Sequence, residues 1–518
     1  MPEPVFHPED LSRIRERGMD PEALARQLEL FRFPTGHLQI ARPATVGDGI
    51  RRIADPDLSA LRSEYESGKA LGRFSKFVPA SGAATRMFSG LDALRLRADW
   101  GSLEDLRALA HRGDPDAVQG VVFFENLSRF AFYPALVDRL PGNMAEIPSD
   151  IPPRRILESL LDPAGLDLIR CSKGLVPFHH GEGKPRTALE EHLIEAIELT
   201  QDSGGGVRAH FTVLVEHLGK FKAAAEQCIP NLGGMKVGNL HLSFSVQDRS
   251  LDTLAAEPDF RPARDRQGVL LFRPGGHGAL LRNLQETNGD LVFLKNIDNV
   301  ASGTLRDVGW DARKILGGLA IKLRGTADLY LEDLEGGLPP PERLAEIIRF
   351  LENGFGRKII SSGRDALRLE LQAALDRPMR VCGMVPNAGE PGGGPCWVRR
   401  GPDREDLQIV ESAQVDPGSP DQLHRLQAGT HFNPVDMVAC LRDRTGKPYD
   451  LSRYVENEWT LLSRKMLEGR EILILEKPGL WNGAMADWLT VFVEIPLESF
   501  HPVKTVMDLL RPGHQSKE

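Results

Sequence analysis

The feature that most constrains the fold is a change in the spacing of apolar residues between about residues 171 and 330. Short apolar runs of strand length alternate there with segments whose apolar residues recur every three or four positions. The runs stand at 210–215 (HFTVLV), 241–246 (HLSFSV), 269–272 (VLLF) and 291–294 (LVFL). Buried strands separated by helices predict a Rossmann-like α/β fold, with a mixed, mostly parallel sheet and helices on both faces. Such folds carry their chemistry on loops at the carboxyl ends of the strands.

Four parts are predicted along the chain. Residues 1–70 form an N-terminal helical arm, and residues 71–335 form the α/β core, with a helical insertion at 89–170. Gly and Pro cluster within 336–430, which predicts a loop-rich accessory region. Residues 431–518 return to strands and form a C-terminal α/β segment.

Composition excludes several classes of partner. A formal net charge of −9 supplies no general basic field for nucleic acid or an anionic membrane. No apolar stretch reaches membrane-spanning length, and the first residues lack the pattern of a signal peptide. The five cysteines are widely spread without a CxxC pair, so we expect a reduced, cytoplasmic protein without a disulfide framework. The oligomeric state stays open.

The segment 77–87, FVPASGAATRM, joins an apolar run to a loop of small residues. A phosphate or nucleobase can approach such a backbone closely, and the loop N–H groups can point at it. A simple packing turn between a strand and a helix is the alternative. The candidate ligand-binding residues here are Ala80, Ser81, Gly82, Ala83, Thr85 and Arg86.

Two further loops offer binding groups. Lys173 stands beside a glycine, and its ammonium is either a point charge for a phosphate or a solvated surface group. In the segment 273–278, RPGGHG, the glycines Gly275, Gly276 and Gly278 surround His277 and leave room for a planar or sugar-like ligand. The alternative for that segment is a tight turn that caps the next helix.

Carboxylates and amides supply the candidate metal site. Asn296 and Asp298 follow the apolar run 291–294 and suit Mg²⁺, which takes oxygen ligands and shares substrate phosphates; a plain Asx turn is the alternative. Asp487 is either a second metal carboxylate or a turn residue. Lys504 is either a phosphate contact or an exposed lysine of an amphipathic helix.

Together and in this order, these stretches resemble the sugar-phosphate nucleotidyltransferases, and specifically their UDP-sugar pyrophosphorylase branch. The segment 80–87 is similar to the Gly-rich signature loop of that family, with Ala84 where glycine is usual. The stretches KGLVPF, PGGHGALLRNL, NIDNV and FHPVKTVMDLL resemble its lysine, nucleoside and sugar, magnesium and Pro-Val-Lys-Thr segments. The whole chain also resembles a bacterial family described only as a domain of unknown function.

The resemblance implies a fold of the nucleotidyltransferase or GT-A type and a Mg²⁺-dependent reaction. A nucleoside triphosphate such as UTP and a sugar 1-phosphate would give a nucleotide-sugar and pyrophosphate. Arg86 and Lys173 would hold the triphosphate, and Lys504 the sugar phosphate or the leaving group. Asp298, with Asp487, would bind Mg²⁺, while the two small-residue loops and Asn296 would contact nucleotide and sugar.

Two other classes stay open. A nucleotide-sugar-dependent glycosyltransferase shares this fold but would want a second acid where Asn296 stands. A non-catalytic nucleotide-sugar-binding protein would need no metal carboxylate, so the joint presence of Arg86, Lys173, Asp298 and Lys504 argues against it. The sequence names neither the base nor the sugar.

Overall fold

The chain forms two compact units. The computed structural model describes residues 6–32, 37–140, 146–147, 151–181, 183–232, 239–273, 275–361, 363–389, 392–402, 404–467 and 469–515. Unit 1 comprises Met1–Phe77, Ser245–Leu294 and Arg313–Ile495, and unit 2 comprises Val78–Phe244, Lys295–Ala312 and Pro496–Glu518. Each unit therefore gathers three separate stretches of sequence, and neither coincides with a single predicted range.

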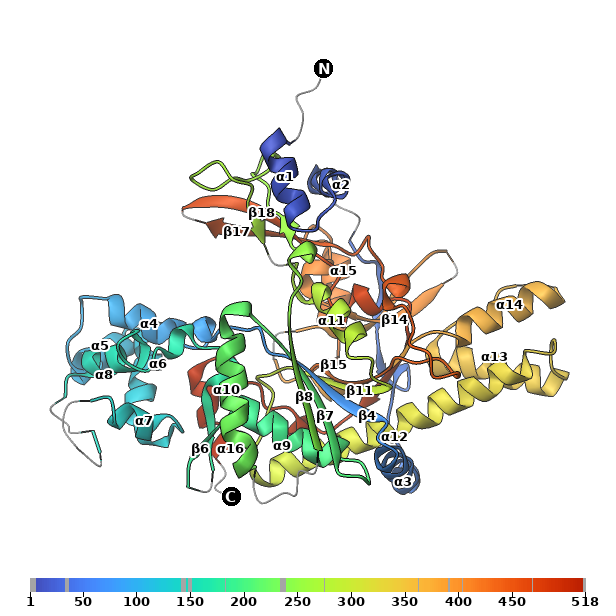
Figure 1. Ribbon diagram of the computed structural model, residues 1–518, viewed down its shortest axis with the longest axis horizontal. Helices are drawn as coiled ribbons and strands as arrows, with labels where there is room; N and C mark the ends of the chain where they lie inside the picture. Colours follow the sequence, from blue (N-terminus) through green and yellow to red (C-terminus); the bar gives the residue numbers. More distant parts are fainter. Residues whose placement is uncertain are drawn as a thin grey trace. The chain divides into compact units, whose positions relative to one another are not determined.

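Unit 1 is built around a mixed, mostly parallel sheet (Figure 1). Its strands are β1 (Ile40–Pro43), β2 (Thr45–Val46), β3 (Gly49–Arg51), β9 (Thr253–Leu254), β10 (Phe272–Arg273), β12 (Met379–Pro386), β13 (Gly394–Arg399), β14 (Glu405–Val410), β15 (His431–Phe432), β16 (Asp436–Cys440), β17 (Leu461–Leu467), β18 (Arg470–Glu476) and β19 (Leu489–Glu494). The strands β4 (Phe74–Pro79), β8 (Asn239–Val246) and β11 (Leu291–Lys295) run from one unit into the other.

The main sheet of unit 1 has the order β2-β3-β19-β12-β16-β11-β4. The pairs β2–β3, β3–β19, β19–β12 and β11–β4 are parallel, whereas β12 and β16 are antiparallel. The prediction of a mostly parallel sheet is confirmed.

Helices cover both faces of this sheet, as predicted. On one face, Phe74 of β4 stacks on Phe293 of β11 and lies 5.2 Å from the ring of Tyr65 in α3. On the other face, Phe77 and Val292 share a buried cluster with leucines of α11. Since side chains alternate along a strand, the two sets leave β4 and β11 in opposite directions. Each fully buried aromatic side chain contributes about 1.5–3 kcal/mol to folding.

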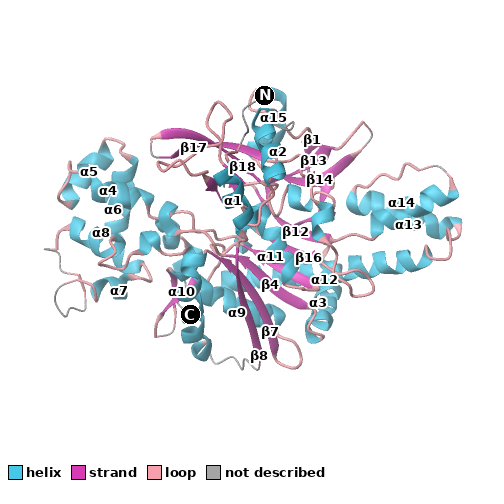
Figure 2. Ribbon diagram, turned by 45° about the horizontal axis from the view of Figure 1, so that its top comes forward, coloured by secondary structure: helices cyan, strands magenta, loops and turns pink. Residues whose placement is uncertain are grey.

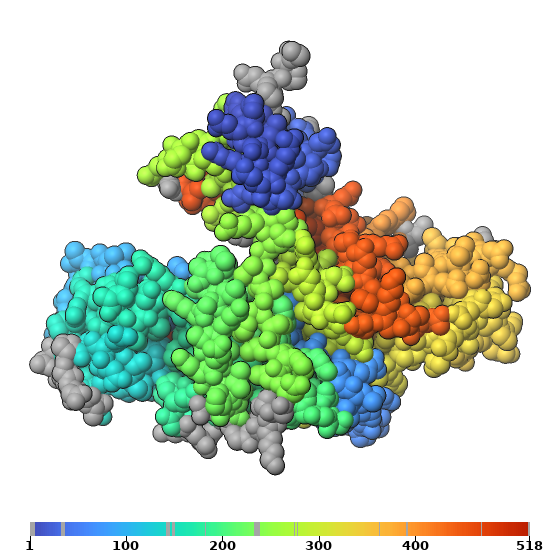
Figure 3. Space-filling view, in the orientation of Figure 1, coloured from blue at the N-terminus to red at the C-terminus, as the bar shows by residue number. Residues whose placement is uncertain are grey.

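The helices of unit 1 are α1 (Pro8–Glu16), α2 (Pro21–Arg32), α3 (Asp55–Ala70), α11 (Leu280–Glu286), α13 (Pro341–Phe355), α14 (Arg364–Leu375) and α15 (Pro420–Gln427), and α12 (Gly303–Asp333) begins in unit 2. Helices α13 and α14 lie side by side (Figure 2). The N-terminal pair α1 and α2 buries Ile14, Leu24 and Phe31 against β9 and β18. In the space-filling view these blue helices lie on the yellow-green segment that contains β9 (Figure 3).

Unit 2 carries the predicted helical insertion. Its helices are α4 (Ser89–Leu96), α5 (Leu103–His111), α6 (Pro115–Glu125), α7 (Tyr133–Val137), α8 (Pro153–Leu161), α9 (Ala188–Thr200), α10 (Leu218–Cys228) and α16 (Pro512–Gln515). The first five stand within the range 89–170, as the apolar spacing indicates. The strands β5 (Pro177–His180), β6 (Pro185–Thr187) and β7 (Gly206–Val213) complete the unit.

The structure departs from the sequence reading in three places. The arm 1–70 contains the strands β1, β2 and β3 besides its helices, and only Phe272 of the run 269–272 is in a strand. The region 336–430 is not mainly loop, because it supplies the central strand β12 and the helices α13 and α14. Pro378 precedes β12, Pro386 is its last residue, and the fully buried Arg380 interrupts its apolar pattern, which hides the strand from sequence analysis.

The structure also bears on two expectations from the sequence, which concern membrane-spanning segments and the cysteines. Among the described helices, none combines the length and hydropathy that crossing a membrane requires. All five cysteines are free thiols, as expected, and four of them are buried.

Candidate active site

The small-residue loop after β4 is held open by backbone pairing in unit 2. The Ala80 N–H donates to the Thr212 carbonyl at 2.8 Å, which extends β4 beside β7. The loop then turns into the short 3-10 helix η1 (Ala84–Arg86). In the described contacts the N–H groups of Ser81, Gly82 and Ala83 donate to no protein acceptor, and a Cβ at Gly82 would meet no atom within 4 Å. This backbone is therefore open to an anion.

Residues 171–173 run antiparallel to this loop. Lys173 N–H donates to the Gly82 carbonyl at 3.1 Å, and Ala84 N–H donates to the Cys171 carbonyl at 2.9 Å. Between them, the buried Ser172 hydroxyl donates to the Ala80 carbonyl at 3.1 Å. Ala84, where the resemblance leads us to expect glycine, is fully buried. The side chain at this position therefore packs inside the protein.

Lys173, Asp298 and Lys504 meet in one ion cluster. Lys173 Nζ donates to Asp298 Oδ2 at 2.8 Å and to the Val503 carbonyl at 2.7 Å. Lys504 Nζ donates to the same Oδ2 at 3.1 Å. The Asp298 side chain is 10% exposed, whereas that of Lys504 is 46% exposed, so the cluster opens to solvent on the Lys504 side. Residues more than 300 positions apart are thus joined at the end of β11.

The C-terminal segment is fixed beside Asp298 by backbone contacts. Val503 N–H donates to the Asp298 carbonyl at 3.0 Å, and His501 N–H donates to the Asn299 side-chain oxygen at 3.0 Å. The Asp508 carboxylate accepts from the N–H groups of Lys504 and Thr505 and caps the 3-10 helix η13 (Val506–Leu510). These hydrogen bonds fix the backbone at Lys504, from which its side chain reaches Asp298.

The electrostatics of the cluster favour an anion. Burial alone would raise the pKa of the Asp298 carboxyl, but the ammonium groups of Lys173 and Lys504 together hold that pKa below its usual value. One carboxylate and two ammonium groups leave a net positive charge. Each ammonium has three N–H donors, and the described contacts use two of them on Lys173 and one on Lys504. The remaining donors can bind phosphate oxygens.

Arg86 and Thr85 stand at the exposed end of the same loop. Both residues are exposed, and the Thr85 hydroxyl donates to the Ile169 carbonyl at 3.3 Å. The described contacts include no ion pair of the Arg86 guanidinium. Arg86 is therefore available to an anion that reaches the loop.

Magnesium binding by Asp298 stays a prediction, because the ion would have to share this carboxylate with the two ammonium groups that already contact it. Both ammonium contacts use Oδ2 of Asp298, which leaves Oδ1 as an oxygen ligand. Mg²⁺ often binds through one or two carboxylates plus substrate phosphates and water. Asn296 accepts the N–H of Asn299 through its carbonyl at 3.2 Å and forms the turn after β11. No group of three His, Cys, Asp or Glu side chains suited to a metal occurs among the described residues.

The RPGGHG segment belongs to unit 1, and two of its glycines have a packing explanation. A Cβ at Gly275 would lie 2.3 Å from the Leu251 carbonyl oxygen, and one at Gly278 would lie 2.1 Å from that of Pro478. Gly276 has a φ of +73°. The backbone thus requires these glycines without a ligand. Pro274 and the side chain of His277 lie outside the described part of the structure, so the binding role of this loop stays a prediction.

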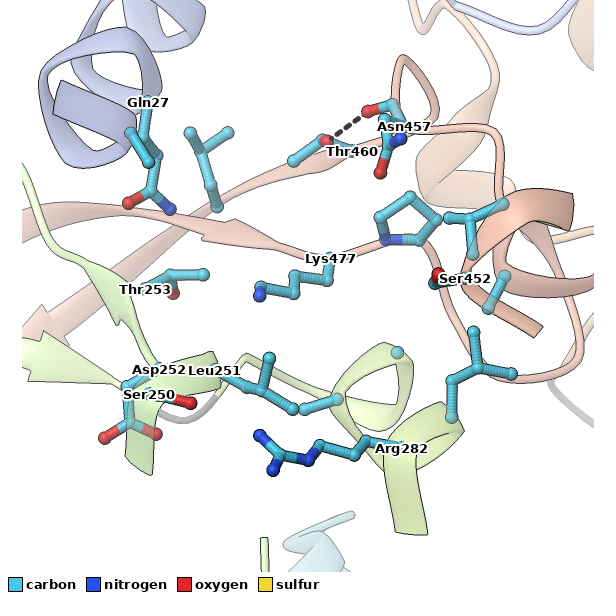
Figure 4. Close-up of a pocket in the computed structure, with 18 of the residues that line it drawn as sticks. Gln27, Ser250, Leu251, Asp252, Thr253, Arg282, Ser452, Asn457, Thr460 and Lys477 are labelled. Atoms are coloured by element: carbon cyan, nitrogen blue, oxygen red, sulfur yellow. Dashed lines mark hydrogen bonds between the residues drawn. The ribbon is translucent and has the colours of Figure 1, made fainter. Parts of the chain in front are cut away.

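A cavity of about 720 Å³ in unit 1 includes Gly278 in its lining (Figure 4). The Lys477 side chain extends across it toward Thr253, and Arg282 lies below (Figure 4). Burial lowers the pKa of Lys477, while Asp248 and Asp252 oppose this. Asp248 also pairs with Arg282 at 2.5 Å. Because its cations face carboxylates, the cavity does not select a ligand by charge.

Asp487 also belongs to unit 1, where arginines surround it. Its Oδ1 lies 3.4 Å from Arg404, 3.5 Å from Arg400 and 3.9 Å from Arg357. Guanidinium groups around a carboxylate disfavour a second cation, so this surrounding favours a salt-bridge role over metal binding. The metal role of Asp487 stays an untested prediction.

Sequence reasoning missed two parts of this chemistry. The Val503 carbonyl and the Ser172 hydroxyl hold Lys173 and its loop, but neither has a sequence signal beyond standing beside a lysine. The arginines around Asp487 come from positions 357 to 404, and only the tertiary fold brings them together.

The comparison with family models confirms the predicted resemblance to a family described only as a domain of unknown function. A family model described as "Domain of unknown function (DUF4301)" matches residues 7–515. Similar solved structures include the UDP-glucose pyrophosphorylase of Leishmania major (12% identity, TM-score 0.44) and the UDP-glucose phosphorylase of Trypanosoma brucei (13%, 0.44), each match covering 97% of this chain and 77% of that chain. The UDP-N-acetylglucosamine pyrophosphorylase of Trypanosoma brucei has 11% identity and a TM-score of 0.47, covering 94% and 74%. No match was found among curated proteins.

Proposed function

We propose that this chain, which belongs to the family described as Domain of unknown function (DUF4301), is a nucleotidyltransferase that joins a nucleoside triphosphate to a sugar 1-phosphate. The observation that carries the proposal is the cluster of Lys173, Asp298 and Lys504 beside the open loop after β4. Its net positive charge suits two phosphate-bearing substrates. The resemblance favours UTP as the nucleotide, and free thiols with a triphosphate substrate fit the cytoplasm.

In the proposed reaction, an oxygen of the sugar 1-phosphate attacks the α-phosphorus of the nucleoside triphosphate. The bond between that phosphorus and the bridging oxygen breaks, and pyrophosphate leaves. The protein has to position two anions in line and neutralise the charge that separates them. No covalent enzyme intermediate is needed.

Each residue then has a physical task. The open N–H groups of the loop and Arg86 bind the triphosphate, and Lys173, fixed by Val503 and Asp298, supplies a buried positive charge beside it. Lys504 is the exposed member of the cluster and can leave Asp298 to contact the sugar phosphate or the leaving group. Asp298 would hold Mg²⁺ through Oδ1, and the ion would neutralise phosphate charge when bound.

A pyrophosphate-release screen tests the proposal. Each nucleoside triphosphate is crossed with a panel of sugar 1-phosphates in the presence of Mg²⁺, with Asp298→Asn as the matched inactive chain. We expect release with at least one pair in the wild-type chain only. Absence of release with every pair, or equal release by Asp298→Asn, would overturn the assignment.

A further inference from the structure

A cationic pocket lies in unit 1, at the amino ends of the parallel strands β12 and β19. This cavity of about 390 Å³ is bounded by the segment after α13, by α14 and by the turn between β13 and β14. Arg377 stands two residues before β12, and Asp487 two residues before β19. Active-site loops of α/β folds sit at the carboxyl ends of strands, so this pocket lies away from where such folds react.

Cations dominate its lining. Arg357, Lys358, Arg377 and Arg404 line the cavity, and Glu370 is the only acidic residue among the described lining residues. The Glu370 carboxylate accepts the N–H groups of Ile360 and Ser361 at 3.2 and 2.8 Å and so anchors the loop. Its negative charge is therefore partly engaged by the backbone.

The guanidinium groups are unevenly paired. Arg404 contacts Asp406 at 2.6 Å. Arg357 has its closest described carboxylate oxygen, Asp487 Oδ1, 3.9 Å away and donates instead to the Asp487 carbonyl at 3.4 Å. Arg377 donates only to carbonyl oxygens in the described contacts, those of Ala373 and Asp487 at 2.6 and 3.0 Å. Two of the three arginines thus lack a close counter-charge.

The guanidinium groups of Arg357 and Arg377 are also largely buried. The Arg357 side chain is 12% exposed, and burial together with repulsion from Arg377 lowers the pKa of Arg357 to about 9. Burial lowers the pKa of Arg377 as well. Holding buried like charges together destabilises a protein unless an anion joins them.

We propose that this pocket binds a phosphate group, as inorganic phosphate or as a small phosphate monoester. Guanidinium forks match the oxygens of phosphate, and a dianion balances two arginines that have no close carboxylate. The volume of the cavity leaves room for a small organic group on the phosphate. The site does not depend on the proposed transferase reaction.

Isothermal titration of the full chain with inorganic phosphate, and separately with a sugar phosphate, tests this site. Chloride at matched ionic strength is the reference. Arg357→Gln and Arg377→Gln should each weaken the binding by about tenfold or more, because each removes a charge-assisted contact. Lys358→Gln, an exposed change that leaves folding intact, should weaken it by about threefold. Arg343→Gln, on α13 and paired with Asp333, is the matched control and should bind normally.

The two probes distinguish the sources of the phosphate. Equal affinities assign the site to free phosphate, and tighter binding of the sugar phosphate assigns it to a monoester; either result supports the pocket. Lys504→Gln separates this site from the proposed active site, because the pocket should keep its affinity in that variant. Absence of binding by the wild-type chain, or binding unchanged in Lys358→Gln and both arginine variants, would overturn the proposal.

Discussion

Asp298 in unit 2 and Asp487 in unit 1 are both carboxylates surrounded by cations, yet their surroundings differ in kind. Asp298 is 10% exposed and meets two ammonium groups at 2.8 and 3.1 Å, beside a loop with open N–H groups. Asp487 is 32% exposed and has its guanidinium neighbours at 3.4 to 3.9 Å. Lysines on flexible stems can release a carboxylate to a substrate, whereas planar guanidinium groups form fixed forks.

This difference teaches that charge alone does not identify an active site. Around Asp298, unused lysine donors and an exposed partner give the substrate a way in. Near Asp487, the positive charges without a close carboxylate are those of Arg357, which lies 3.9 Å from Asp487 Oδ1, and of Arg377, which donates to carbonyl oxygens in the described contacts. The first arrangement suits a reaction, and the second suits the binding of a static anion.

Replacing Asp298 and Asp487 by asparagine, one at a time, should give the largest difference in activity between the two sites. We expect Asp298→Asn to lower kcat/KM for pyrophosphate release by about 10³, because it removes the charge that positions both lysines and the metal ligand. Asp487→Asn should change kcat/KM by less than about threefold. Steady-state kinetics on both variants measure this, with thermal unfolding as the check on folding. Equal losses of kcat/KM in the two variants would indicate that Asp487 does bind the metal.

Removing one cation from each site should affect the free energy of unfolding differently. Lys173→Met leaves Asp298 with one partner and should cost about 3 kcal/mol, whereas Arg357→Met removes a poorly matched buried charge and should cost nothing or stabilise by about 1 kcal/mol. Urea unfolding at pH 7 compares the two. A loss of more than about 2 kcal/mol in Arg357→Met would mean that this guanidinium is a structural tie.

The pH dependence of the same pair gives a smaller, signed effect. The folded pKa of Arg357, about 9, lies well below the ordinary pKa of a guanidinium group, so its charge opposes folding most below pH 9. That destabilisation shrinks as the pH rises through 9. Any stability advantage of Arg357→Met should therefore be smaller at pH 10 than at pH 7.

Much of the fold was predictable because its signals are local. The strands β7, β8, β11, β18 and β19 coincide with apolar runs, and the insertion helices follow their apolar spacing. Strand β12 was not predicted, because its second residue is the buried Arg380, which donates hydrogen bonds to Thr490, Trp481 and Gln408. A polar side chain satisfied by distant partners looks like a loop residue in sequence.

The candidate site was predictable only where a family resemblance supplied the order of the motifs. Spacing along the chain could not bring Lys173, Asp298 and Lys504 together, because their contacts span 125 to 330 positions. For Asp487 the local pattern could not reveal its arginine neighbours. At Gly275 and Gly278 the same glycine pattern serves close backbone packing, which sequence cannot distinguish from a ligand loop.

The most direct test compares two lysines of unit 2 that share their exposure and pairing. Lys504 is 46% exposed and lies 3.1 Å from Asp298, while Lys184 is 47% exposed and lies 3.0 Å from Glu190. With the substrate pair found by the screen, Lys504→Gln should lower kcat/KM for pyrophosphate release by about 10² to 10³. Lys184→Gln should retain wild-type activity. Equal activity of the two variants would contradict the role of the Lys173, Asp298 and Lys504 cluster in phosphate transfer.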